Sequence, residues 1–116
     1  MVGATHFTGS GLRDWLIQRA TAVVLAFYTL FLFVFYLIER PLTYHVWHTL
    51  FSEPLMKVAN IIVLLAILAH AWIGIWTVVT DYVKPLNARL IVHFLVALAL
   101  LSLLAFGLLI FLGVPT

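Results

Sequence analysis

Three long stretches of the sequence contain no Asp, Glu, Lys or Arg: residues 20–38, 58–80 and 90–116. A helix needs about 20 apolar residues to cross the hydrocarbon core of a bilayer, and it satisfies its own backbone hydrogen bonds in lipid. The strands of a transmembrane β-barrel would instead alternate in polarity over about 10 residues, and these stretches do not alternate. The pattern therefore predicts helices that span a membrane.

The sequence as a whole predicts an all-α integral membrane bundle of three transmembrane helices, over about 15–38, 58–81 and 88–113, in a single anchor domain of residues 1–116. Composition excludes the other classes, because 66% of the residues are hydrophobic and 9% are charged. A soluble enzyme, a nucleic-acid binder and a disordered segment are all incompatible with such values. The absence of cysteine excludes disulfides and iron–sulfur ligation by this chain.

The positive charges predict the orientation of the chain in the membrane. One side of the three spans carries four of them, namely Arg13, Arg19, Lys84 and Arg89, and the other side carries two, Arg40 and Lys57. Cytoplasmic segments are enriched in Lys and Arg, so we expect a cytoplasmic N-terminus. The connection 39–57 is rich in aromatic residues, as interfacial segments are. The connection 81–89 is short and holds Pro85, which predicts a tight return.

His70 is the one ionisable side chain expected deep in the membrane, about 15 Å from the end of the second span at helical rise. Its imidazole is suited either to axial ligation of a metal such as iron or to a hydrogen bond with a neighbouring helix. Gly74 and Thr77 share its helix face and form a strip of small residues. Either a planar cofactor or another helix fits against such a strip.

The remaining histidines do not complete a two-histidine iron site with His70. His93 is expected about 10 Å nearer the cytoplasmic surface, estimated from helical rise, and His45 and His48 lie outside the spans. A second histidine ligand for the same iron therefore has to come from another protein chain.

Three further polar residues at the predicted cytoplasmic boundary have two interpretations each. Asp81 opposes the dipole at its helix C-terminus, so it has either a specific partner or a surface ion pair with Lys84. Tyr82 is either an aromatic-belt residue or a hydrogen-bond donor to a carbonyl. Arg19 is either a positive-inside anchor or a partner for a buried carboxylate. Trp15, Trp72 and Trp76 are expected to be interface and packing aromatics.

Two motifs resemble those of one family. The runs His70-Ala71-Trp72-Ile73-Gly74-Ile75-Trp76 and Thr80-Asp81-Tyr82-Val83-Lys84-Pro85 resemble the small cytochrome b membrane-anchor subunit of bacterial succinate dehydrogenase, respiratory complex II. The entry to the first span, Arg13-Asp14-Trp15 with Arg19-Ala20-Thr21-Ala22, is similar to the same family. Length, number of spans and orientation fit along essentially the whole chain.

The resemblance implies a second, larger cytochrome b anchor subunit, with which this chain pairs to hold a haem b. It also implies a flavoprotein subunit and an iron–sulfur subunit docked on the cytoplasmic face of a bacterial inner membrane. Electrons from succinate, in the tricarboxylic acid cycle, would reach ubiquinone and the respiratory chain.

Residue by residue, the resemblance makes His70 the axial ligand of the haem iron and Tyr82 the ubiquinone contact, with Asp81 nearby. Arg19 is expected near the haem propionates. Arg13 stands where relatives carry a histidine, so a role for that side chain does not carry over.

Two functions remain open: an electron-transfer subunit that binds haem and quinone, and a haem-free assembly anchor of a fumarate reductase-type complex. In either case the chain itself is expected to perform no succinate chemistry. It has no nucleotide-binding glycine motif and no catalytic carboxylate cluster. We expect it to be a subunit of an oxidoreductase complex, succinate:quinone oxidoreductase, and to contribute to the quinone site.

Overall fold

Four helices make up the computed structural model, which describes residues 11–114. In chain order they are α1 (Gly11–Ile38), α2 (Tyr44–Ser52), α3 (Pro54–Tyr82) and α4 (Leu86–Gly113). Three of them, α1, α3 and α4, are long and apolar enough to cross a membrane. The longest dimension of the molecule, 50 Å, exceeds the hydrocarbon thickness of about 30 Å. The prediction of an all-α, multi-pass membrane protein with three spanning helices is confirmed.

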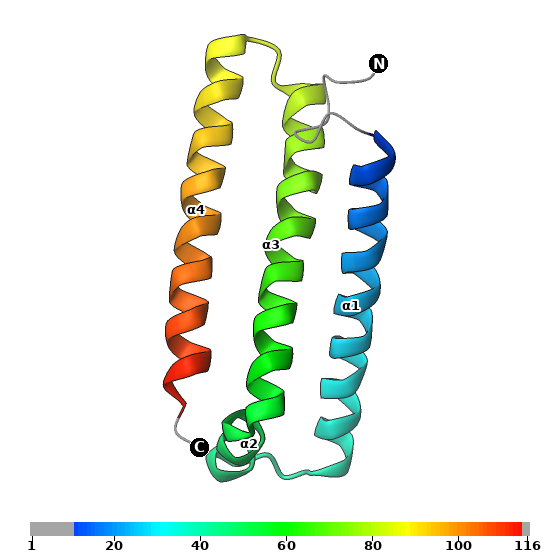
Figure 1. Cartoon of the computed structure of the whole chain (residues 1–116), viewed down its shortest axis with the longest axis vertical. Coiled ribbons are helices and arrows are strands. Elements are labelled where there is room, and N and C mark those ends of the chain that lie inside the picture. The colour runs from blue at the N-terminus through cyan, green and yellow to red at the C-terminus, as the bar shows by residue number, and fades with distance from the viewer. Residues whose placement is uncertain (1–10, 115–116) are drawn as a thin grey trace.

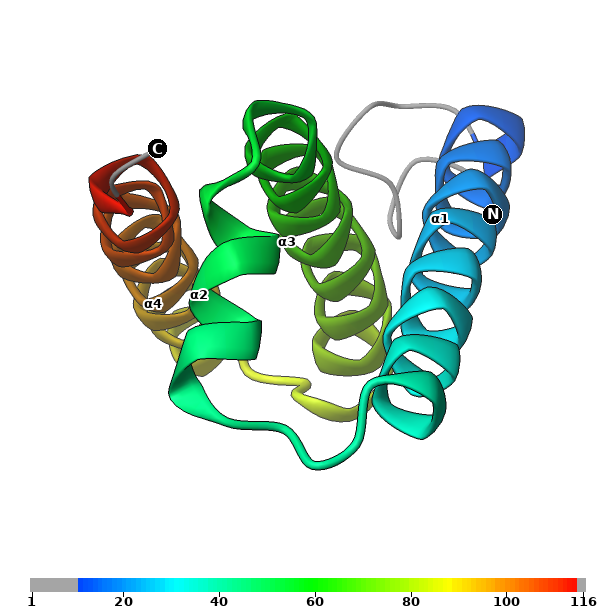
Figure 2. The ribbon, with the colours of Figure 1, turned by 90° about the horizontal axis from the view of Figure 1, so that it is seen from below.

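The three long helices stand in one row with α3 between α1 and α4 (Figures 1 and 2). Both outer helices pack on α3, and the buried apolar side chains of the described residues all belong to α3: Met56, Val63, Ala66, Ile73 and Val79. Leu, Ile and Phe side chains cover the outer surfaces and are exposed. A surface of this kind is stable against lipid tails, which are as apolar as the side chains.

The connection expected over residues 39–57 is more structured than the sequence indicated, because it contains the helix α2 at one end of the bundle (Figure 2). The hydroxyl of Thr43 caps α2 by accepting a hydrogen bond from the backbone N–H of Val46, at 3.3 Å. Trp47 anchors α2 to α1, with its ring centroid 5.6 Å from that of Phe35. This end of the molecule is called the α2 end below.

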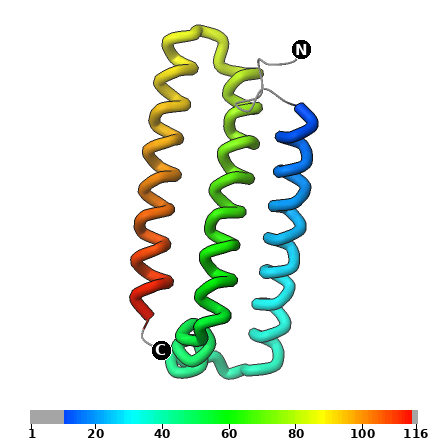
Figure 3. Tube along the Cα trace, viewed as in Figure 1, coloured from blue at the N-terminus to red at the C-terminus, as the bar shows by residue number. Residues whose placement is uncertain are grey.

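The opposite end, called the N-terminal end below, holds the start of α1 and the connection between α3 and α4 (Figure 3). α3 ends at Tyr82 and α4 begins at Leu86, directly after Pro85. Proline is well tolerated beside the first turn of a helix because its missing N–H has no helical partner there. The expected tight return at Pro85 is present.

Close helix contacts occur on both sides of α3. On the α4 side, a Cβ placed on Gly107 would lie 2.7 Å from Leu64 Cδ2, so only glycine fits there without a shift. On the α1 side, the hydroxyl of Tyr28 donates a hydrogen bond to Asn60 Oδ1. Asn60 is 2% exposed, so this bond satisfies a polar group that has no access to water.

Candidate functional site

His70 lies near the middle of α3 and is half-buried. Its Nδ1 atom is 3.1 Å from the hydroxyl oxygen of Thr21 on α1. His70 therefore forms a hydrogen bond between α3 and α1, which is one of the two interpretations that the sequence left open for it. The bond engages one ring nitrogen only, and an imidazole has two. Bonding to α1 and ligation of a metal are thus compatible in the same side chain.

A groove of about 610 Å³ runs along α1 beside His70. Its walls are formed by Ala22, Leu25, Ala26, Thr29, Leu30, Phe33 and His70. Three of the α1 residues, Ala22, Ala26 and Thr29, follow the spacing of one helix face and leave the groove wide because their side chains are short. The volume falls within the range of about 300–1,000 Å³ that is usual for cofactor sites. His70 is the titratable side chain of this lining.

The groove fits a flat apolar group held by one imidazole. Its walls consist mainly of apolar side chains and include one imidazole that can ligate a metal. These are the features that a haem pocket requires from a protein. An imidazole whose other nitrogen is hydrogen-bonded is the usual arrangement for a metal-ligating histidine. The residues that line the groove are therefore suited to a haem, and the groove is open at the surface of the chain.

The strip of small residues predicted on α3 does not line the groove, and α1 packs against it at Gly74. A Cβ on Gly74 would lie 3.4 Å from Gln18 Nε2, so α1 packs directly against this glycine. Thr77 donates its hydroxyl to the backbone oxygen of Ile73 at 2.9 Å. Of the two alternatives left open for the strip, another helix is what approaches Gly74. The space beside His70 comes from small residues on α1 instead.

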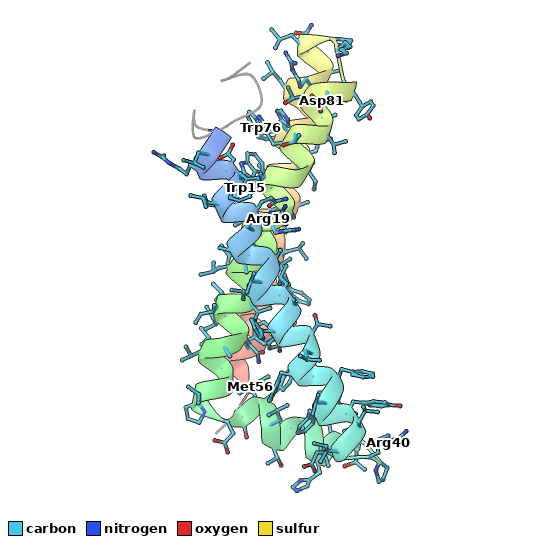
Figure 4. The ribbon with its side chains drawn as sticks, turned by 90° about the vertical axis from the view of Figure 1, so that its right-hand side faces the viewer. Trp15, Arg19, Arg40, Met56, Trp76 and Asp81 are labelled. Atoms are coloured by element: carbon cyan, nitrogen blue, oxygen red, sulfur yellow. The ribbon has the colours of Figure 1, made fainter. Side chains whose placement is uncertain are left out.

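Arg19 lies on the same face of α1 as the groove, because Ala22 and Ala26 follow it by three and seven residues. Its side chain is exposed, and its guanidinium carbon is 5.4 Å from the centroid of the Trp15 ring (Figure 4). A cation–π contact of this kind fixes the direction of a long side chain. A positive charge thus stands beside the groove on the side of the N-terminal end.

Asp81 lies in the last turn of α3, at the N-terminal end (Figure 4), and Tyr82 is the last residue of that helix. Neither residue lines the groove. Tyr82 is twelve positions after His70 in the chain, which corresponds to about 18 Å along a helix. Tyr82 is 79% exposed. Within residues 11–114, Asp81 forms no ion pair, so the surface pair considered with Lys84 is not made. The structure does not gather these two residues and His70 into one site.

The tryptophans of α3 pack towards α4. The His93 ring of α4 stacks on the Trp76 ring with centroids 4.0 Å apart and planes 5° apart. Trp72 lies beside both rings, 5.4 Å from Trp76 and 6.4 Å from His93. The interpretation of Trp72 and Trp76 as packing aromatics agrees with this cluster. His93 contributes to the α3–α4 interface and does not line the groove.

Thr21, the contact of His70, was not singled out by the sequence analysis as a functional residue. The signal that points to it is a spacing: Asp14, Gln18 and Thr21 are separated by four and three residues and so share a face of α1. Asp14 is 5% exposed, and the buried Oε1 atom of Gln18 has no hydrogen-bond partner in the described part of the chain. This polar face of α1 is turned towards α3.

Comparison with known proteins bears on this geometry. Residues 4–109 match the model of the family described as succinate dehydrogenase/fumarate reductase transmembrane subunit. The chain belongs to this family. The resemblance drawn from the motifs around His70 and Tyr82 is thereby confirmed.

Two relatives of this transmembrane subunit carry the same description, succinate dehydrogenase hydrophobic membrane anchor subunit. The one from Coxiella burnetii is 48% identical over 79% of this chain and 80% of its own length. The one from Rickettsia felis is 32% identical over 65% of this chain and 62% of its own length. The role of membrane anchor is therefore supported for this family member by both the matched family and its relatives.

Proposed function

We propose that this chain is the small cytochrome b anchor of a succinate dehydrogenase, and that it binds a haem b and a ubiquinone jointly with a larger anchor subunit. The two anchors hold a flavoprotein subunit and an iron–sulfur subunit at the membrane. Electrons from succinate oxidation then reach ubiquinone. The chain itself carries out none of the succinate chemistry, and it contributes to the quinone site of the complex.

The observation that carries the proposal is the position of His70. The imidazole lies near the middle of a spanning helix, beside a groove of about 610 Å³, with one ring nitrogen bonded to Thr21. An ionisable side chain at such depth is costly and is functional by default. In the proposed role His70 ligates the haem iron through its other nitrogen, and the apolar α1 wall excludes water from the site. A bound haem b supplies a one-electron redox centre within the membrane.

The positive charge of Arg19 and the number of histidines at the groove support a site shared with a second chain. Arg19 precedes the groove residue Ala22 by one turn of α1, and in the proposed role its positive charge pairs with a carboxylate such as a haem propionate. His93 stacks on Trp76 in the α3–α4 interface. Among the described residues His70 is the histidine that lines the groove, so a second histidine ligand would come from the larger anchor subunit.

The quinone site is proposed at the N-terminal end, around Tyr82. The distribution of Lys and Arg favours a cytoplasmic location for this end in a bacterial inner membrane, on the side where the iron–sulfur subunit would dock. The exposed Tyr82 hydroxyl donates to a quinone carbonyl, and the bond strengthens as negative charge develops on that oxygen. Asp81 precedes Tyr82 and is exposed, and in the proposed site it orients the Tyr82 side chain or the quinone ring.

A reduced-minus-oxidised optical spectrum of the purified complex tests the proposal. We expect a b-type band in the wild type, a shifted or weakened band in His70→Leu, and an unchanged band in His93→Leu. The last variant is the matched control, because His93 is also half-buried in a spanning helix. A wild-type complex without the band would favour the haem-free anchor of a fumarate reductase-type complex. An identical band in His70→Leu would assign the ligand to another residue.

A further inference from the structure

Thr21 makes three close polar contacts through one hydroxyl group. Its Oγ1 atom lies 2.8 Å from the backbone oxygen of Ile17, 3.1 Å from that of Gln18 and 3.1 Å from His70 Nδ1. The first two contacts are within α1, and the third joins α1 to α3. The hydroxyl is therefore placed between its own helix backbone and the imidazole.

The proton of this hydroxyl is committed to the α1 backbone. A hydroxyl has one proton to donate and two lone pairs that accept. The backbone oxygens of Ile17 and Gln18 can only accept, so in both contacts the proton comes from the Thr21 hydroxyl. The contact with Ile17 is the shortest of the three. The lone pairs of Oγ1 are left for the imidazole. His70 Nδ1 must then be the donor in the bond to Thr21.

A neutral imidazole carries one N–H and one free lone pair. With the proton on Nδ1, the lone pair is on Nε2. We infer that Thr21 is a positioning residue that fixes the tautomer and the ring plane of His70, so that Nε2 is the nitrogen available to a metal. This inference rests on the proposed role of His70 as a haem ligand. It adds that a residue of α1, Thr21, determines which nitrogen of His70 is available to the metal.

A hydroxyl in this position differs from the usual partners of ligating histidines, which are carboxylates, backbone carbonyls or water. A neutral hydroxyl adds no charge to the low-dielectric interior of the membrane, where an unpaired carboxylate would be costly. The hydroxyl is itself oriented by the α1 backbone. Rotation of the imidazole about its side chain would therefore break the bond between the two helices.

Removal of the hydroxyl tests this role in the intact complex. Thr21→Val keeps the branched shape and deletes the hydroxyl, whereas Thr21→Ser keeps the hydroxyl. Thr77→Val is the matched control, because Thr77 makes the same bond to the backbone four residues earlier, at 2.9 Å from Ile73. The measurements are the rate of haem transfer to excess apomyoglobin and the low-spin g-values in the electron paramagnetic resonance spectrum. Neither depends on turnover with succinate.

We expect haem loss to be about 10- to 100-fold faster in Thr21→Val, the range found when a partner of a metal ligand is removed, together with shifted g-values. Thr21→Ser should restore both values, and Thr77→Val should match the wild type. Wild-type behaviour of Thr21→Val would overturn the inference and leave the role of His70 intact. A wild-type complex without haem would overturn both. If Thr21→Val does not assemble, Thr21→Ala gives the same decision by the same two measurements.

Discussion

The hydrogen bond between Tyr28 and Asn60 gives a stability prediction that depends on the membrane environment. Asn60 is 2% exposed in the middle helix of the bundle, and the Tyr28 hydroxyl donates to its Oδ1 atom. Tyr28→Phe deletes that donor and keeps the aromatic ring. The amide oxygen of Asn60 then remains buried with one hydrogen bond fewer, and neither water nor lipid replaces the lost donor.

The expected loss is about 1 kcal/mol of the free energy of unfolding. An unsatisfied buried acceptor costs about 1–3 kcal/mol in proteins generally. Hydrogen bonds between membrane helices are worth less, about 0.6 kcal/mol on average and up to about 1.7, because partners are also found in the unfolded state. A loss of about 1 kcal/mol lowers the equilibrium constant for folding about fivefold. The double variant Tyr28→Phe with Asn60→Leu should recover most of this loss, because no polar atom is then left unpaired.

Titration with SDS in mixed micelles, followed by tryptophan fluorescence, measures these differences. The four tryptophans of the chain supply the signal, and one of them, Trp47, packs its ring on Phe35 of α1 with centroids 5.6 Å apart and so reports on the packing of α1. Tyr36→Phe is the control, since it removes a hydroxyl from an exposed tyrosine of the same helix. Equal stability of Tyr28→Phe and Tyr36→Phe would refute the reasoning. So would a double variant that is less stable than Tyr28→Phe alone.

Two further predictions concern the other side of α3 and the proposed quinone end. Gly107→Leu should cost about 1–3 kcal/mol of stability through overpacking, because even a Cβ at this position lies 2.7 Å from Leu64 Cδ2. The same SDS titration checks it, with Gly113→Leu as a neutral control since nothing lies within 4 Å of a Cβ there. Tyr82→Phe should lower the rate of ubiquinone reduction about 10-fold, in line with the loss of a hydrogen bond to a charged acceptor. Haem content and succinate oxidation with an artificial acceptor should stay unchanged, and a wild-type quinone reductase rate would return Tyr82 to the role of a boundary aromatic.

The spanning helices were predictable from the sequence because length and hydropathy decide whether a segment crosses a membrane. The rotation of each helix about its axis was not. Apolar side chains are equally stable against lipid and against another helix, so the apolar periodicity that marks the inner face of a soluble helix is weak here. This is why Gly74 appeared equally suited to a cofactor and to a helix, and only the packing of Gln18 against it decided between them.

The same reasoning applies to the site residues. The depth of His70 followed from counting along the chain, but its contact with Thr21 depends on how α1 and α3 face each other. Polar residues at helical spacing carry more information than apolar ones in such a chain. The helix α2 was missed because nine residues of mixed polarity give too short a pattern to distinguish a helix from an interfacial loop.

The row of helices with α3 in the centre has a consequence for how the chain is made. Each spanning helix packs on the spanning helix that comes before or after it in the chain, α1 on α3 and α3 on α4. Because every such contact joins neighbours in synthesis order, the chain needs no late closure between its ends, and contacts that are local in sequence form fastest. α1 can dock as soon as α3 has entered the bilayer, and α4 follows last. The contacts between the spanning helices can therefore form in the order in which the helices enter the membrane.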